Sequence, residues 1–152
     1  MSRGVATVLA VVLLVVACVT AAATVGAVVA TDPGAAPPVA DLRLSVDADA
    51  DRLTLRHAGG EAIPAEAIRL RVRVNGTALA HQPPVPFFAA RGFRAGPTGP
   101  FNPATAGPWR AGQTAALRLA STNHPRPAPG DRVTVQVSTE AAVVAELTAT
   151  AN

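Results

Sequence analysis

Side chains that could do acid–base, nucleophilic or metal chemistry are few and scattered in this sequence. The three histidines are His57, His81 and His124, and none has a second ligand at the spacing of a metal site. The chain has one cysteine and contains no HExxH motif, no GxSxG nucleophile elbow and no phosphate-binding glycine loop. We therefore predict no catalytic residue, no metal and no cofactor, and we do not expect an enzyme.

An acidic run at residues 47–51 resembles the start of a calcium-binding loop. Asp47, Asp49 and Asp51 alternate with alanine in this run. The glycine and the distant glutamate that complete such a loop are missing, because Arg52 and Leu53 follow directly. An acidic turn between two strands is the better interpretation, and a calcium site is the weaker alternative.

Asn75-Gly76-Thr77 is an N-glycosylation sequon, in which Asn75 would be the modified residue. Asn-Gly is also the favoured pair for a two-residue hairpin turn. The sequence leaves both interpretations open.

Three arginines, Arg69, Arg71 and Arg73, alternate with apolar residues just before this sequon. The period of two places them on one face of a strand. This face is either solvated or paired with carboxylates on a neighbouring subunit.

The longest uncharged stretch lies at residues 5–30, between Arg3 and Asp32. As a helix it would be about 39 Å long at roughly 1.5 Å per residue, which is enough to cross a bilayer. Since Arg3 is the only charge before it, we expect a cytoplasmic N-terminus and an exported C-terminal domain.

Three interpretations of this segment compete. It could be a cleaved secretory signal, although it is longer than the usual apolar core of one. It could be a lipoprotein signal, because residues 15–18 fit the lipobox pattern with Cys18 as the lipidated residue. It could also be a retained helix that packs against copies of itself, since small residues at four-residue spacing let helices approach closely. These small residues are Ala17, Ala21, Ala22, Gly26 and Ala30.

Beyond a Pro/Gly/Ala linker at residues 31–40, apolar and polar residues alternate in short runs separated by turn signals. We predict strands near residues 42–47, 53–55, 68–74, 117–119, 133–137 and 143–148, with turns at 47–51, 59–60, 75–76 and 130–131. Such strands bury one face each, which favours an all-β sandwich of the immunoglobulin-like kind at residues 41–152. The net charge of +3 does not indicate nucleic-acid binding.

The segment from residue 82 to residue 112 is rich in proline and carries every aromatic residue of the chain. These residues are Phe87, Phe88, Phe93, Phe101 and Trp109. Long connections of this kind are usually functional or ordered by their own side chains. The aromatic side chains either fold back over the sandwich or form an exposed patch that binds surfaces or neighbouring subunits.

The beginning of the chain also matches a known pattern. Arg3-Gly4-Val5-Ala6 and the apolar run after it resemble the class III signal and helix of archaeal type IV pilins, particularly the haloarchaeal ones. Residues 55–63, 68–77, 109–112 and 129–133 are also similar to members of that family.

The resemblance implies cleavage of the leader, residues 1–4, between Gly4 and Val5 by a prepilin peptidase. It implies a single N-terminal transmembrane helix that becomes the filament core, followed by the β-sandwich outside. The partners would be other pilins, through the helix, and the pilus assembly machinery in the membrane. The expected function is a structural subunit of a cell-surface filament that serves in adhesion. The alternative is a monomeric membrane-anchored or lipid-anchored extracellular β-sandwich that binds a ligand.

Overall fold

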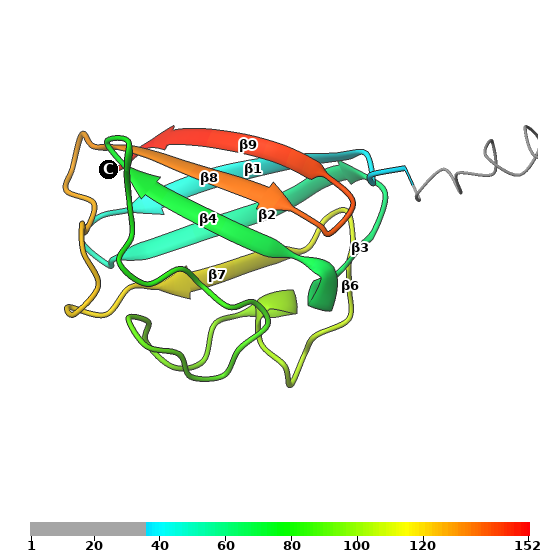
Figure 1. Cartoon of the computed structure of the whole chain (residues 1–152), viewed down its shortest axis with the longest axis horizontal. Helices are drawn as coiled ribbons and strands as arrows, with labels where there is room; N and C mark the ends of the chain where they lie inside the picture. The colour runs from blue at the N-terminus through cyan, green and yellow to red at the C-terminus, as the bar shows by residue number, and fades with distance from the viewer. Residues whose placement is uncertain (1–35) are drawn as a thin grey trace, which may run out of the picture. The chain divides into compact units, whose positions relative to one another are not determined.

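A computed structural model describes residues 36–152, which form a β-rich domain (Figure 1). The strands are β1 (Ala40–Asp47), β2 (Arg52–Gly60), β3 (Ile63–Pro64), β4 (Arg69–Val74), β5 (Thr77–Ala78), β6 (Pro108–Trp109), β7 (Thr114–Arg118), β8 (Arg132–Ser138) and β9 (Val143–Thr150). Two short 3-10 turns, η1 (Ala65–Ala67) and η2 (Gly99–Phe101), complete the secondary structure of this part of the chain. None of its helices is long and apolar enough to cross a membrane.

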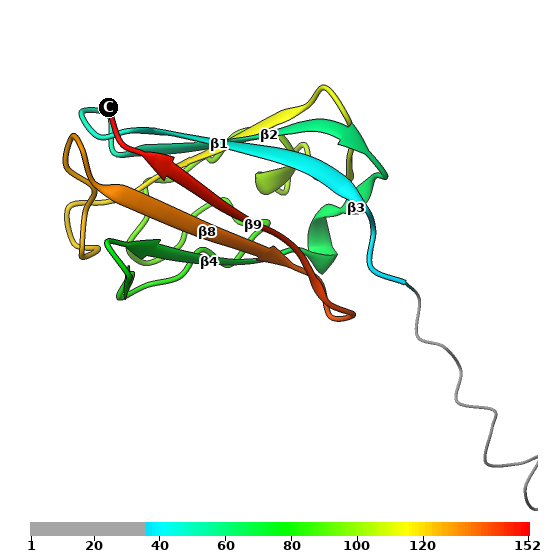
Figure 2. The ribbon, with the colours of Figure 1, turned by 90° about the horizontal axis from the view of Figure 1, so that it is seen from above.

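Two sheets pack face to face, as Figure 2 shows from above. One has the strand order β1-β2-β7 and the other β5-β4-β8-β9, while β3 and β6 form a separate small pair. Every pairing within the sheets is antiparallel. Each strand predicted from the sequence is present, and the arrangement is that of a β-sandwich.

Alternation of apolar and polar residues accounts for how each strand faces the core. On β4, Leu70, Val72 and Val74 are buried while the arginines between them are exposed. On β8, every second residue is a fully buried valine. Because successive side chains of a strand point to opposite faces, this pattern gives each sheet one apolar face to bury.

One edge of the sandwich is closed by hydrogen bonds between the two sheets. Just after β9, the amide of Asn152 donates to the carbonyl of Val46 (3.2 Å), and its own carbonyl accepts from the amide of Ala48 (2.9 Å). At the opposite edge, the amide of Thr98 donates to the carbonyl of Ala116 on β7 (2.9 Å). The outer backbone groups of β7 are therefore partly covered, which keeps this edge from pairing with other chains.

The start of the domain is fixed to the turn after β2. The amide of Val39 donates to the Glu61 carboxylate, and the amide of Glu61 donates to the Val39 carbonyl, each at 2.8 Å. Gly60 has a φ of +96°, and a Cβ there would collide with the Val39 carbonyl oxygen. The prediction of a turn at residues 59–60 is wrong, because these glycines are the last residues of β2 and the chain turns directly after them. The first strand begins at Ala40, inside the stretch predicted as linker.

Candidate interaction surfaces

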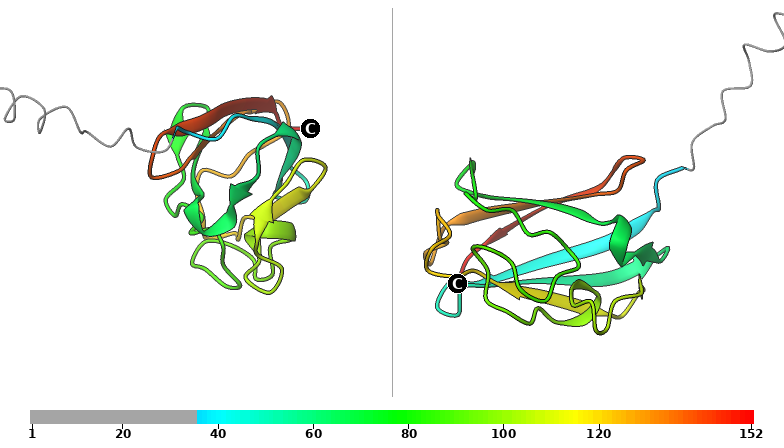
Figure 3. Two further views of the ribbon diagram at one scale, coloured as in Figure 1. Left: turned by 90° about the vertical axis from the view of Figure 1, so that its right-hand side faces the viewer. Right: turned by 60° about the horizontal axis from the view of Figure 1, so that its bottom comes forward.

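Four of the five aromatic residues in the proline-rich segment lie in the core. Phe87, Phe93, Phe101 and Trp109 are buried, whereas the Phe88 side chain is 64% exposed. Figures 1 and 3 show the segment beside β7, on the side of the sandwich away from β1 and β9. An exposed patch of all five aromatics is therefore excluded, and the alternative, that they fold back over the sandwich, holds for four of them.

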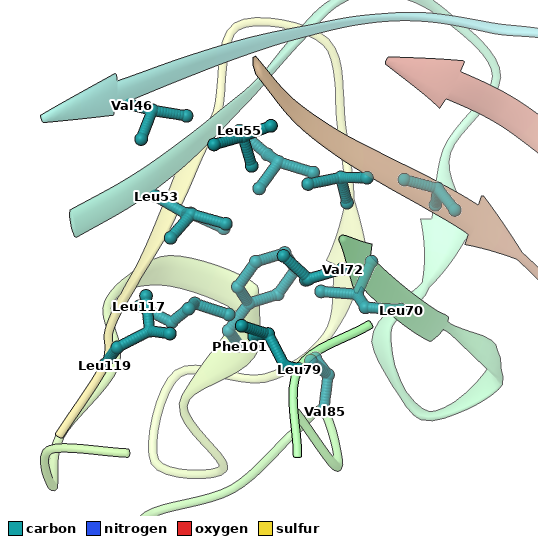
Figure 4. Packing of buried hydrophobic residues seen from close by; sticks show 14 of the residues in the cluster. Val46, Leu53, Leu55, Leu70, Val72, Leu79, Val85, Phe101, Leu117 and Leu119 are labelled. Atoms are coloured by element: carbon teal, nitrogen blue, oxygen red, sulfur yellow. The ribbon is translucent and has the colours of Figure 1, made fainter. Parts of the chain in front are cut away.

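Contacts between these rings order the segment. The ring centroids of Phe87 and Phe93 lie 5.5 Å apart, and those of Phe101 and Trp109 are also 5.5 Å apart in an edge-to-face arrangement. The amide of Phe87 donates to the carbonyl of Phe101 (2.9 Å), which joins the two pairs. Figure 4 shows Phe101 between the sheets, among buried side chains such as Val72 and Leu117. This part of the sequence thus supplies core residues that regular strands would otherwise supply.

The arginines of β4 face solvent, as one of the two sequence interpretations predicts. Arg69 lies 3.7 Å from the Glu140 carboxylate, and both side chains are mostly exposed. Arg71 and Arg73 form no ion pair within the described residues. Such an exposed pair contributes at most about 1 kcal/mol. Pairing with carboxylates of a neighbouring subunit stays a prediction.

The sequon lies in a hairpin turn. Asn75 (φ 49°) and Gly76 (φ 82°) join β4 to β5 and both have positive φ, which is the signature of a type I′ turn. The Asn75 Nδ2 donates to the Asp131 carboxylate, and its Oδ1 accepts from the Arg132 amide, each at 2.9 Å. The turn prediction is confirmed. Glycosylation of Asn75 stays a prediction.

The acidic run forms the turn between β1 and β2. The Asp47 carboxylate accepts a hydrogen bond from the amide of Ala50 (3.0 Å). Asp51 is nearly buried, and its carboxylate accepts a hydrogen bond from Arg126 Nε (3.0 Å). The interpretation as an acidic turn is confirmed. No group of three or more potential metal ligands occurs within residues 36–152.

Two buried polar side chains have structural roles that the sequence did not predict. His57 is fully buried, its Nε2 lies 2.7 Å from the Glu61 carbonyl, and its ring meets Trp109 edge-on. Asn123, also fully buried, accepts from the amide of His81 and donates to the carbonyl of the same residue. The sequence does not reveal their burial, because the ring that contacts His57 (Trp109) and the partner of Asn123 (His81) lie far away along the chain. Both have structural roles in holding loops to the sandwich.

Two of the most exposed large apolar side chains lie at the end of the sandwich where the described chain begins. Val39 is 76% exposed, and Val143, at the start of β9, is 52% exposed. The same end has an open hollow of about 420 Å³ between the linker, η1 and the turn before β9. Ala36 and Pro38 contribute linker atoms to its wall. This end is therefore a candidate contact surface.

The remaining predicted site residues lie outside the described residues. They are the cleavage-site residues Arg3, Gly4, Val5 and Ala6, the small residues Ala17, Ala21, Ala22, Gly26 and Ala30, and Cys18. A scan against models of known protein families finds no match, and a search of curated proteins finds no significant similarity.

Proposed function

We propose that this chain is a type IV pilin-like structural subunit of a cell-surface filament that serves in adhesion. The observation that carries the proposal is the uncharged run of residues 5–30, which directly follows Arg3-Gly4 and precedes a β-sandwich. Removal of residues 1–4 would delete Arg3, the basic residue that precedes the helix. The helix could then leave the bilayer only where its apolar surface is buried elsewhere, and a bundle of identical helices provides that burial.

The β-domain supports this proposal in two ways. Its first residues are held by paired hydrogen bonds between Val39 and Glu61, so that a force on the linker would be transmitted directly to the sheet. Val39 and Val143 expose apolar surface at the same end, where a neighbouring copy in a filament would cover it. Before processing, the protein would span the membrane once with a cytoplasmic N-terminus, and it would then become part of an extracellular filament.

We also propose an immunoglobulin-like topology for the sandwich. The longer strands β1, β2 and β7 would correspond to strands A, B and E of that fold, and β4, β8 and β9 to C, F and G. Directly after β9, Asn152 forms hydrogen bonds with Val46 and Ala48 in the pattern of parallel strands, which fits this assignment. With one cysteine in the chain, the domain has no disulfide between its sheets.

The alternative is a monomeric, lipid-anchored extracellular protein that binds a ligand. One specific observation favours it: residues 15–18 end in the chain's single cysteine and fit a lipobox. The two proposals predict different mature N-termini, so one measurement separates them.

Intact mass and N-terminal sequencing of the protein extracted from cell membranes provide the test. A pilin-like subunit starts at Val5, and Gly4→Asp should block this cleavage, whereas Cys18→Ser should leave it unchanged. A lipid-modified start at Cys18 would reject the pilin proposal, and so would an intact leader in cells that have prepilin peptidase.

Filament formation is the second readout. Negatively stained cells that express the chain should carry filaments, and cells without it should lose them. Gly26→Leu should prevent assembly without changing cleavage, because close helix approach needs a small residue. Correct cleavage with no filament in any strain that expresses the chain would contradict the structural role.

A further inference from the structure

A shallow pocket of about 580 Å³ lies on the outer face of the β1-β2-β7 sheet. Three arginines line it from three separate segments: Arg52 from β2, Arg118 from β7 and Arg94 from the proline-rich segment. No carboxylate is among the lining residues. Within residues 36–152, none of the three guanidinium groups has a carboxylate within ion-pair distance.

The strand register brings two of these charges together. Arg52 and Arg118 are directly opposite each other on β2 and β7. Side chains at such positions start from Cβ atoms about 4.5–5.5 Å apart, and like charges there repel each other. The other cross-strand neighbour of Arg52 is Asp47 on β1, which forms no ion pair with it, so an anion bound between the two arginines would relieve their repulsion.

Local hydrogen bonds hold the other parts of the pocket in place. The Arg118 Nε donates to the carbonyl of Ala50 (3.2 Å), which orients the guanidinium and leaves its terminal nitrogens available. The amide of Arg94 donates to the carbonyl of Arg118 (2.9 Å), so the third arginine is attached beside the second. Arginine presents several donors in a planar fork that matches the oxygens of a carboxylate, sulfate or phosphate group.

Two hydroxyl groups add neutral hydrogen-bonding capacity. Thr54 and Thr98 both line the pocket. The Thr98 Oγ1 accepts from the amide of Ala116 (3.1 Å), so its own proton is free to be donated to a ligand. The pocket therefore offers charged donors for an oxyanion and hydroxyl groups for the polar atoms around it.

The same sheet face extends the basic surface beyond the pocket. Arg56 is exposed and lies four residues along β2 from Arg52, which corresponds to about 13 Å along the strand. A linear polymer with repeated anionic groups could contact both ends of this row.

Single-stranded nucleic acid would also need successive aromatic platforms for its bases. No aromatic side chain lines the pocket, and Phe88 is the one exposed residue among the phenylalanines and the tryptophan of the described domain.

We infer that this pocket binds the oxyanion groups of an acidic polysaccharide, held by Arg52, Arg94 and Arg118. The inference rests on the β-domain alone and does not depend on filament assembly.

The test uses the full chain in mild detergent and measures binding by calorimetry. The probes are dextran sulfate, uncharged dextran of the same length, polygalacturonate and a single-stranded DNA oligonucleotide. Dextran sulfate carries sulfate groups and polygalacturonate carries carboxylate groups, so comparing the two identifies which oxyanion the pocket prefers. The pocket variant combines Arg52→Gln with Arg94→Gln. Its matched control combines Arg71→Gln with Arg73→Gln, which removes the same charge from the outer face of the other sheet.

We expect an anionic polysaccharide to bind and the uncharged dextran not to bind. The pocket variant should weaken binding about tenfold or more, since it removes two charge-assisted contacts. The control variant should change binding by less than about twofold, because distant exposed charges are screened at moderate salt. Unfolding midpoints should match for both variants.

Three results would overturn the inference. One is the absence of binding to both anionic polysaccharides. Another is an equal loss in the pocket and control variants, which would indicate diffuse charge attraction. The third is tighter binding of the oligonucleotide through the same arginines, which would assign the pocket to nucleic acid.

Discussion

Replacing Phe101 with alanine tests whether the proline-rich segment is a structural part of the core. Phe101 belongs to η2 and is fully buried against Trp109, in the cluster shared by both sheets. Phe88 is 64% exposed on the same segment. Phe88→Ala is therefore a matched control that removes the same atoms from a different environment.

The expected magnitudes differ strongly. Phe101→Ala removes a buried ring and leaves a cavity that the sheets cannot fully close, and such substitutions typically cost about 3–5 kcal/mol. The total stability of a domain of this kind is about 5–15 kcal/mol, so the variant should lose a large part of it. Phe88→Ala gives up little buried surface and should change the free energy of unfolding by about 0.5 kcal/mol or less.

The assay is denaturant unfolding of the full chain in detergent, followed by the fluorescence of Trp109, which is the only tryptophan. The two variants are compared by their midpoints at equal slope, because the substitution beside Trp109 can alter the signal itself. If Phe101→Ala and Phe88→Ala shifted the midpoint equally, or if Phe101→Ala cost less than about 1 kcal/mol, the segment would not be part of the core.

Two further predictions concern the domain's loops. Gly60→Ala should destabilise the fold by about 1–2 kcal/mol, since positive φ is unfavourable for alanine and its Cβ would collide with the linker. Gly59→Ala, which meets nothing within 4 Å, should stay near wild type in the same unfolding assay. The pKa of Asp131 is lowered by hydrogen bonds from the Ala128 amide and then from the Asn75 side chain. Because the pKa of Asp131 is lower in the folded state than in the unfolded chain, the ionised carboxylate stabilises the fold at pH values above the ordinary pKa of about 3.9. This contribution is lost as the pH falls through the pKa of the folded state. Asp131→Asn should make the free energy of unfolding depend less on pH in this acidic range. An unchanged pH dependence would contradict the assignment.

Much of the fold is predictable from local sequence. The alternation in β4 and β8 has the period of the pleat itself, so it identifies both the strands and their buried faces. The Asn75-Gly76 turn follows from residue type, because few residues accept two successive positive φ angles. Local sequence predicts a turn at residues 59–60, whereas Gly60 ends β2 and allows the close approach of the Val39 carbonyl, a contact between residues distant in the sequence.

The candidate sites were much less predictable. Five aromatic residues in a proline-rich segment look alike in sequence, but only Phe88 is exposed, because the others reach the space between the sheets. The pocket arginines are equally inconspicuous. Arg52, Arg94 and Arg118 lie in three separate parts of the sequence and meet only through the pairing of β2 with β7 and of β7 with the segment beside it.

The sequence by itself determined the parts of this protein that depend on neighbouring residues: the uncharged run at 5–30, the strands and the Asn-Gly turn. The tertiary structure alone decided which strands are neighbours, which aromatic rings are buried and which arginines share a pocket. The physical reason is that pleat period and turn geometry are local properties of the backbone. Burial and charge proximity depend instead on contacts between residues far apart in the chain, and many different pairings satisfy the same local pattern.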